Sequence, residues 1–199
     1  MLSSTDKFQK RLFDIVLSVL GICMTWWLML LAWVVASIET KSNGLFMQER
    51  IGKEGKPFLV FKIKTMKPMK GITTTVTTSK DNRVTKSGIF FRKTKIDELP
   101  QLFNVLLGTM SFVGPRPDVP GFADTLEGED RSMLLLQPGI TGPASLKYKN
   151  EEEVLAKQKN PEQYNREVIW PDKVNINLIY LKTWSLKKDI RYIIKTITG

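Results

Sequence analysis

The sequence predicts a mixed α/β, mainly helical chain that begins with a membrane-associated helix and continues as a small cytoplasmic domain. Three observations lead to this fold class: a long apolar run near the N-terminus, one short β-rich run, and two amphipathic stretches with helical spacing further along. We therefore assign residues 1–40 to the membrane segment and residues 41–199 to the domain.

The apolar run extends from Ile15 to Ile38, 24 residues without a charged side chain. As a helix it would be roughly 36 Å long, more than a hydrocarbon core of about 30 Å requires. The run is longer than the apolar part of a signal peptide, and Ile38-Glu39-Thr40 is a poor cleavage site. We therefore expect the segment to be retained.

The orientation of this segment follows from its flanks. Basic side chains stand at both ends: Lys7, Lys10 and Arg11 before the run, and Lys41, Arg50, Lys53 and Lys56 after it. Because positive charge favours the cytoplasmic side, both flanks are drawn to that side. This favours a re-entrant helix that bends near Gly21 or at Thr25-Trp26-Trp27. No proline marks such a break, so a single straight span stays open as the alternative.

The domain offers a few local signals. Leu59–Ile63 predicts a strand, and residues 71–80 predict a loop or an edge hairpin. The apolar spacing of Leu99–Leu107 predicts an amphipathic helix with Pro100 in its first turn. Val174–Ile197 carries an apolar pattern interrupted by basic residues, which suits an amphipathic interfacial helix on a membrane or a helix packed on the core with a solvated basic face.

Charge and composition limit the chemistry. The chain has 30 basic and 20 acidic residues, and residues 41–110 hold fourteen basic and five acidic ones, an excess of nine. Such a surface favours an anionic partner: a phosphorylated substrate, an acidic membrane or nucleic acid. Histidine is absent and Cys23 is the single cysteine, which excludes histidine-based catalysis and Cys/His zinc sites. We expect no nucleic-acid partner, because the glycine-aromatic motif of RNA-binding domains is missing.

One cluster draws attention as a candidate site. Arg92, Lys93 and Lys95 stand just before the adjacent acids Asp97 and Glu98. Two rigid loops follow, Gly114–Pro117 and Pro138–Pro143, which can present backbone amides and an arginine to phosphate. On charge pattern alone, a salt-bridged surface is the competing interpretation.

These motifs resemble those of the bacterial sugar transferase family, the monotopic phosphoglycosyl transferases. The similar segments are Lys10-Arg-Leu-Phe-Asp14, Gln48-Glu-Arg-Ile-Gly52, Phe61-Lys-Ile-Lys-Thr-Met66, Arg92 with Asp97-Glu-Leu-Pro-Gln-Leu-Phe-Asn-Val-Leu106, Met110-Ser-Phe-Val-Gly-Pro-Arg-Pro117 and Pro138-Gly-Ile-Thr-Gly142. They occur in family order over nearly the whole chain, and the length resembles the minimal catalytic form. Two departures are Trp26-Trp27 where members commonly have a Ser-Pro pair, and Asn177 where many have an acid.

The resemblance implies transfer of a sugar-1-phosphate from a UDP-sugar to a polyprenol phosphate, usually undecaprenyl phosphate. It places the reaction at the cytoplasmic face of the bacterial inner membrane, in contact with membrane lipid and with UMP as leaving group. Asp97 would be the nucleophile that forms a covalent phosphosugar intermediate, and Glu98 its metal partner or proton acceptor. Asp97 and Glu98 would hold Mg²⁺. The implied phosphate- and substrate-binding residues are Arg92, Arg116, Lys64, Arg50, Thr141 and Gly142.

Two points stay open at this stage. A non-catalytic membrane scaffold of a glycan-assembly complex could carry the same motifs, and release of UMP would distinguish an enzyme from such a scaffold. A homo-oligomer is also compatible with the sequence.

Overall fold

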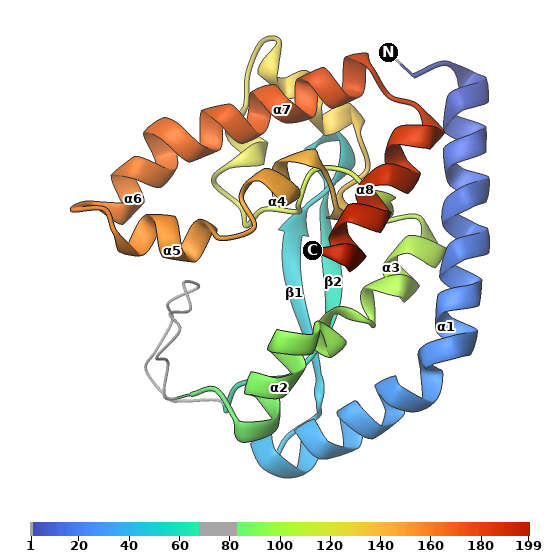
Figure 1. Ribbon diagram of the computed structural model, residues 1–199, viewed down its shortest axis with the longest axis vertical. Helices are drawn as coiled ribbons and strands as arrows, with labels where there is room; N and C mark the ends of the chain where they lie inside the picture. Colours follow the sequence, from blue (N-terminus) through green and yellow to red (C-terminus); the bar gives the residue numbers. More distant parts are fainter. Residues whose placement is uncertain (1, 68–82) are drawn as a thin grey trace. The chain divides into compact units, whose positions relative to one another are not determined.

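The computed structural model describes residues 2–67 and 83–199, and this part of the chain is largely helical with two small sheets (Figure 1). The mixed, mainly helical class is thus confirmed, while the prediction for residues 71–80 lies outside the described residues. The helices are α1 (Ser4–Thr40), α2 (Lys86–Thr94), α3 (Gln101–Leu107), α4 (Pro143–Lys147), α5 (Glu151–Ala156), α6 (Pro161–Tyr164), α7 (Trp170–Lys182) and α8 (Leu186–Thr198). The strands are β1 (Leu45–Ile51), β2 (Pro57–Ile63), β3 (Ser111–Val113) and β4 (Gly139–Thr141).

The chain groups into two compact units. Unit 1 comprises Met1–Val16, Glu49–Phe58 and Val105–Gly199, and unit 2 comprises Leu17–Gln48 and Leu59–Asn104. We describe each unit by itself.

Helix α1 contains the predicted apolar run and extends it at both ends. Its most apolar 18-residue window has a mean hydropathy of 2.3, and by length and composition it is the one helix of the described chain able to cross a membrane. Helical structure continues through Gly21 and Thr25, and the Thr25 hydroxyl donates to the Gly21 carbonyl at 2.7 Å. The side chains of Trp26 and Trp27 are exposed, as expected for a surface facing lipid. The re-entrant topology stays a prediction.

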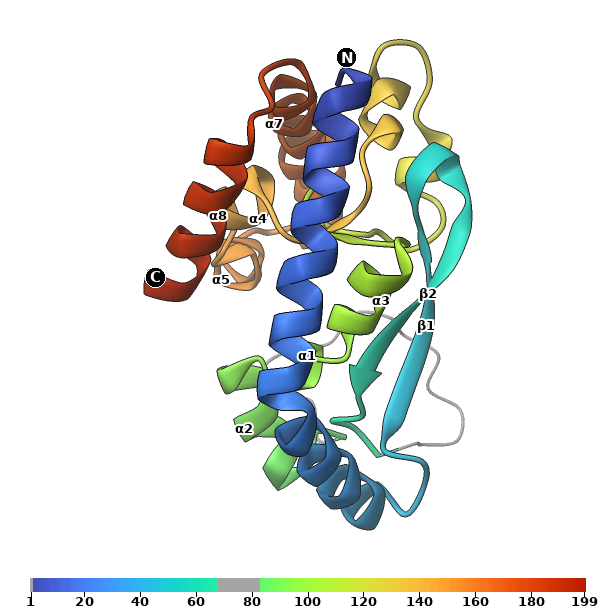
Figure 2. The ribbon, with the colours of Figure 1, turned by 90° about the vertical axis from the view of Figure 1, so that its right-hand side faces the viewer.

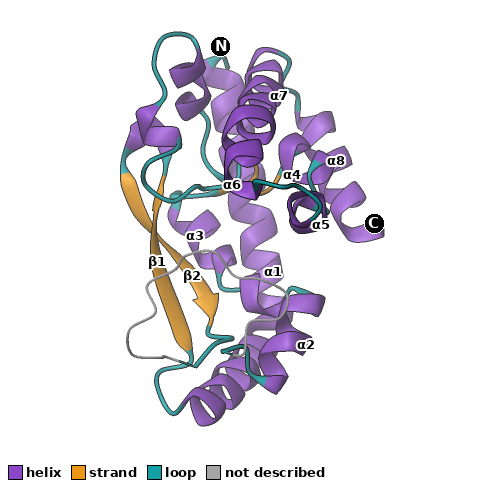
Figure 3. Cartoon of the chain, turned by 90° about the vertical axis from the view of Figure 1, so that its left-hand side faces the viewer, coloured by secondary structure: helices purple, strands orange, loops and turns teal. Residues whose placement is uncertain are grey.

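Unit 2 packs the C-terminal part of α1 against β2 and α2. Ala32 and Ala36 of α1 are buried against Ile63 and Phe91, with Ile96 at the edge of the cluster. Small side chains on α1 permit this close approach. The predicted strand is confirmed and begins two residues earlier, at Pro57, and Figure 3 shows β1 and β2 side by side. The core therefore fixes β2 and α2, the strand that carries Lys62 and the helix that carries Arg92.

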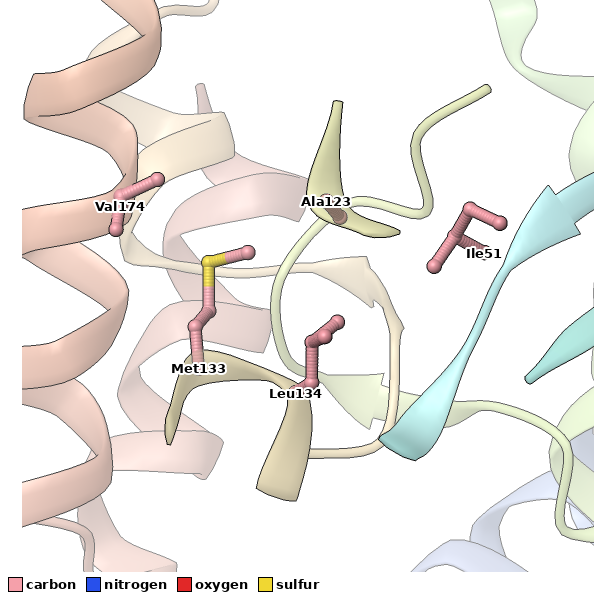
Figure 4. Packing of buried hydrophobic residues seen from close by; sticks show 5 residues of the cluster. All are labelled: Ile51, Ala123, Met133, Leu134 and Val174. Atoms are coloured by element: carbon pink, nitrogen blue, oxygen red, sulfur yellow. The ribbon is translucent and has the colours of Figure 1, made fainter. Parts of the chain in front are cut away.

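Unit 1 is built around a short parallel pairing of β3 with β4. Ser111 lies opposite Gly139, and Val113 opposite Thr141. One apolar cluster joins Ile51, Ala123, Met133, Leu134 and Val174, whose side chains converge in Figure 4. A second cluster packs α7 and α8 against β3 and contains Val113, Leu136, Tyr180 and Leu181.

The apolar pattern of Val174–Ile197 forms two helices, α7 and α8, which are interrupted at Thr183–Ser185 (Figure 2). The Ser185 side chain caps α8 by accepting from the Lys188 amide, which explains the restart. Tyr192 and Ile193 pack on the core, so one of the two interpretations is confirmed. The helix also leaves an apolar stripe exposed beside Arg191 and Lys195, formed by Ile190, Ile194 and Ile197. Its contact with a membrane surface stays a prediction.

The basic side chains at the start of α1 make an ion pair and hydrogen bonds within unit 1. The Lys10 ammonium lies 2.6 Å from the Asp189 carboxylate of α8 and 2.9 Å from the Val113 carbonyl. The Tyr180 hydroxyl also donates to Asp189, at 2.6 Å, and Asp189 is fully buried. The Arg11 guanidinium donates to the carbonyls of Val105 and Leu106 at 2.6 and 2.7 Å. Lys10 and Arg11 therefore attach the start of α1 to the rest of unit 1. The sequence alone gives these residues a role only in the orientation of the helix in the membrane.

We expect Lys10→Met to destabilise the protein by roughly 3–5 kcal/mol, because it leaves the Asp189 carboxylate buried without its cation. Lys7→Met is the matched control, since Lys7 is exposed on the same helix. Thermal unfolding of both variants in the same detergent measures the difference. Equal unfolding midpoints for the two variants would contradict a stabilising role for the Lys10–Asp189 pair.

Candidate active site

The acidic pair, Asp97 and Glu98, lies in the short connection between α2 and α3. Helix α2 ends at Thr94, its C-cap residue Lys95 adopts a left-handed conformation (φ 60°), and a 3₁₀ turn over Ile96–Glu98 follows. The predicted helix is confirmed from Gln101 onward, so Asp97 and Glu98 precede α3 in this turn. The left-handed residue Lys95 redirects the chain two positions before Asp97, so Asp97 and Glu98 belong to neither α2 nor α3.

Asp97 has the features of a ligand-binding carboxylate. Its side chain is buried, with 8% of the residue exposed, and its Oδ1 has no hydrogen-bond partner in the described chain. Burial raises the pKa of Asp97 and the neighbouring Glu98 raises it further, while Lys62, Lys95 and Arg92 act in the opposite direction. Since buried polar atoms are nearly always paired, an unsatisfied oxygen held among cations indicates a position for an absent partner.

Glu98 is paired with a lysine that the sequence analysis did not single out. The Lys62 ammonium lies 3.1 Å from Glu98 Oε1, and both side chains are largely buried. The predicted Lys64 instead donates to the Ser42 hydroxyl at 3.0 Å. Lys62 and Lys64 are two positions apart at the end of the strand run, so alternation alone could not distinguish them. The structure assigns the contact with the acidic pair to Lys62.

Arg92 is held by a buried hydroxyl. Its Nε donates to Thr65 Oγ1 at 2.9 Å, and Thr65 is 7% exposed. The charge of Arg92 also acts on the Asp97 carboxylate. Unit 2 thus brings together the predicted residues Asp97, Glu98 and Arg92, and adds Lys62 and Thr65.

The two predicted loops lie against each other in unit 1. The Gly114 amide donates to the Thr141 carbonyl at 2.9 Å, and the Gly139 amide donates to the Pro115 carbonyl at 2.7 Å. A Cβ atom at Gly142 would collide with the Gly114 carbonyl, so the close approach requires glycine. The Thr141 hydroxyl bonds to that of Thr196 at 2.6 Å. Thr141 and Gly142 therefore support the loop that carries Arg116.

Arg50 and Arg116 come together at an acid that sequence analysis missed. Arg50 donates to the Pro117 carbonyl at 3.3 Å, and burial lowers its pKa, as does the Arg116 charge, while Asp118 opposes them. Burial raises the pKa of Asp118 to about 6 against the effect of Lys173, Arg50 and Arg116. A shallow pocket adjoins this cluster, lined by Arg116, Asp118, Met133, Leu134 and Pro138 among others. The position of Asp118 directly after the Gly-Pro-Arg-Pro run was the available signal.

The raised pKa of Asp118 predicts a pH-dependent stability. A carboxyl group that binds its proton more tightly when folded stabilises the folded state at low pH, and this contribution is lost as the pH rises through about 6. Asp118→Asn removes the titration. We therefore expect the unfolding midpoint of the variant, relative to the parent, to rise between pH 5 and pH 7.5. A difference that stays constant over this range would contradict the raised pKa.

Comparison with known proteins identifies the family of the chain. The model of a family described as "Bacterial sugar transferase" matches residues 5–199. The chain belongs to the bacterial sugar transferase family. It is 34% identical over 195 residues to a UDP-glucose:undecaprenyl-phosphate glucose-1-phosphate transferase of Klebsiella pneumoniae, covering 94% of this chain and 39% of that protein.

Other relatives of this bacterial sugar transferase show the same pattern. It is 30% identical over 210 residues to an undecaprenyl-phosphate galactose phosphotransferase of Salmonella typhimurium, covering 96% of this chain and 40% of the relative. The sugar transferase EpsL of Bacillus subtilis, itself uncharacterized, is 32% identical over 194 residues, covering 94% of this chain and 85% of that protein. The chain thus spans about two-fifths of the length of the named glucose and galactose transferases.

The acidic pair of this sugar transferase fits a magnesium ion. Mg²⁺ in phosphate-transfer sites is commonly held by one or two carboxylates together with substrate phosphates and water. Asp97 and Glu98 supply two carboxylates, and Asp97 Oδ1 is an oxygen without a partner in the described residues. The described chain contains no group of three or more His, Cys, Asp or Glu residues suited to a metal. A substrate diphosphate would therefore have to supply ligands as well.

Proposed function

We propose that this protein transfers a sugar-1-phosphate from a UDP-sugar to undecaprenyl phosphate and releases UMP. The observation that carries the proposal is the buried Asp97 carboxylate beside Glu98 and among Lys62, Lys95 and Arg92, with one oxygen that has no hydrogen-bond partner among the described residues. A nucleophilic carboxylate can approach a diphosphate only where cations offset the negative charge of both groups. The names of the relatives, which specify undecaprenyl phosphate and glucose or galactose, support the substrate class.

The first step forms a covalent intermediate on Asp97. One oxygen of the Asp97 carboxylate attacks the phosphorus that bears the sugar, a P–O bond forms, and the bond from that phosphorus to the bridging oxygen breaks. The bridging oxygen keeps the electron pair and leaves as part of UMP. Arg92, held by Thr65, contributes a fixed positive charge to the developing phosphate charge. Mg²⁺, held by Asp97 and Glu98, would supply further charge neutralisation for the diphosphate.

The second step returns the enzyme to its starting state. An oxygen of undecaprenyl phosphate attacks the phosphorus of the intermediate, and the bond to Asp97 breaks with the electron pair returning to the carboxylate. Glu98 accepts a proton from the incoming phosphate when that phosphate is singly protonated, and releases it to water before the next cycle. Its Oε1 lies 3.1 Å from the Lys62 ammonium. Arg50 and Arg116 of unit 1 remain our candidates for binding substrate phosphate.

The proposal is tested by supplying detergent-solubilised protein with undecaprenyl phosphate, Mg²⁺ and a panel of UDP-sugars, and by measuring UMP and the lipid-linked sugar. We expect one or a few donors to yield both products in equal amounts. Glu54→Gln is the matched control for the Asp97→Asn variant, and it should release UMP at the parent rate. Glu54 is exposed and lies in unit 1. Absence of UMP release with every donor would overturn the proposal and favour the scaffold interpretation.

We also propose that the chain sits at the cytoplasmic face of the inner membrane with a re-entrant α1. In a Cys23→Ser background, Ser4→Cys reports the N-terminus and Lys159→Cys the domain, since both positions are exposed. An impermeant maleimide applied to intact cells should label neither cysteine until the inner membrane is permeabilised. Labelling at position 4 alone would mean that α1 spans the membrane.

A further inference from the structure

Asn104 makes two hydrogen bonds to the backbone of β2. Its Oδ1 accepts from the Phe61 amide at 3.0 Å and its Nδ2 donates to the Leu59 carbonyl at 2.7 Å. The residue is 1% exposed and lies in the middle of α3. The carbonyl of one strand residue and the amide two positions later lie on the same edge of a strand. The side-chain amide of Asn104 therefore bonds to β2 as a neighbouring strand would.

These bonds lie next to the ion pair of the candidate active site. Lys62 directly follows Phe61, and its ammonium contacts Glu98, six positions before Asn104. The segment from Glu98 to Asn104 is thus attached to residues 59–62 at both of its ends. A one-residue shift of a strand turns each side chain to the opposite face, so the position of Lys62 depends on a fixed strand register.

We propose that Asn104 is a positioning residue for sugar-phosphate transfer, because its amide fixes β2 so that the Lys62 ammonium stays against Glu98. The proposal rests on the proposed function for its effect on turnover. Its structural part, the placement of Lys62, is independent of turnover. A leucine at this position has a similar size, makes neither hydrogen bond, and leaves the Leu59 carbonyl and the Phe61 amide without these partners.

A double-mutant cycle separates positioning from general stability. We expect Asn104→Leu to lower the rate of UMP release roughly 10- to 100-fold in the parent, and to have little further effect in a Lys62→Met background. Asn177→Leu is the matched control, because Asn177 is a buried asparagine in unit 1. It should leave the rate near that of each background. An equal loss from Asn104→Leu with and without Lys62 would overturn the proposal.

A second readout does not require turnover. The reactivity of Lys62 toward an amine-acetylating reagent, measured by mass spectrometry relative to the exposed Lys56, should increase several-fold in Asn104→Leu and in Glu98→Gln. It should not change in Asn177→Leu. If Asn104→Leu does not fold, Asn104→Asp keeps the acceptor for Phe61, removes the donor to Leu59, and should raise Lys62 reactivity likewise. Unchanged Lys62 reactivity in a folded Asn104 variant would overturn the proposal, whereas failure of the parent to release UMP would overturn only the proposed function.

Discussion

Asp97→Asn should abolish both the covalent intermediate and the release of UMP, with turnover lowered by at least about 10³-fold. The amide cannot serve as the attacking oxyanion, although it has nearly the same size as the carboxylate. Incubating the parent with its UDP-sugar in the absence of undecaprenyl phosphate should add one phosphosugar mass to the peptide that contains Asp97. The variant should show no such addition by the same mass measurement.

Two further variants define this result. Glu98→Gln should still acquire the phosphosugar mass, because the nucleophile remains. The addition should be slower, because Mg²⁺ loses one of its two carboxylate ligands. Asp97→Ala guards against deamidation of the introduced asparagine, which would restore the parent carboxylate. Normal lipid-linked product from Asp97→Ala would show that another group is the nucleophile, and the role assigned to Asp97 would be wrong.

Local signals predicted the elements that position the acidic pair. The β-rich composition of residues 59–63 and the apolar spacing of residues 99–107 each correspond to an observed element. Both signals arise from side chains a few positions apart, which a one-dimensional pattern records directly. Val174–Ile197 shows the limit, because its apolar spacing continues across Thr183–Ser185 while the Ser185 cap starts a new helix.

The contacts that sequence analysis missed join residues that are far apart in the sequence. Lys10 pairs with Asp189, 179 positions away, and Thr65 holds Arg92, 27 positions away. A charged residue before an apolar helix has the same sequence pattern whether it faces lipid or an internal carboxylate. Similarly, only the fold decides which of two lysines, Lys62 on β2 or Lys64 just after it, meets Glu98. Family motifs indicated the candidate site, but the hydrogen-bond partners of its residues required the structure.

Removing divalent metal should stop UMP release from the parent protein, with a loss of at least about 10²-fold in excess chelator and recovery on addition of Mg²⁺. Two adjacent carboxylates and a substrate diphosphate would place several negative charges together, and Lys62, Lys95 and Arg92 are the cations that act on Asp97. Asp97 Oδ1, which has no hydrogen-bond partner in the part of the chain that the structure describes, gives the ion a ligand in a protein without histidine. Mn²⁺ should also restore activity because it too accepts oxygen ligands, whereas Zn²⁺ should be a poor substitute.

The covalent step provides the control for this prediction. If the ion neutralises the diphosphate, chelation should prevent the phosphosugar mass from appearing on Asp97, and not only slow its transfer to lipid. The unfolding midpoint measured with and without chelator establishes whether the protein stays folded. Full adduct formation in excess chelator would mean that Lys62, Lys95 and Arg92 offset the diphosphate charge by themselves, and Asp97 and Glu98 would then not be metal ligands in the first step.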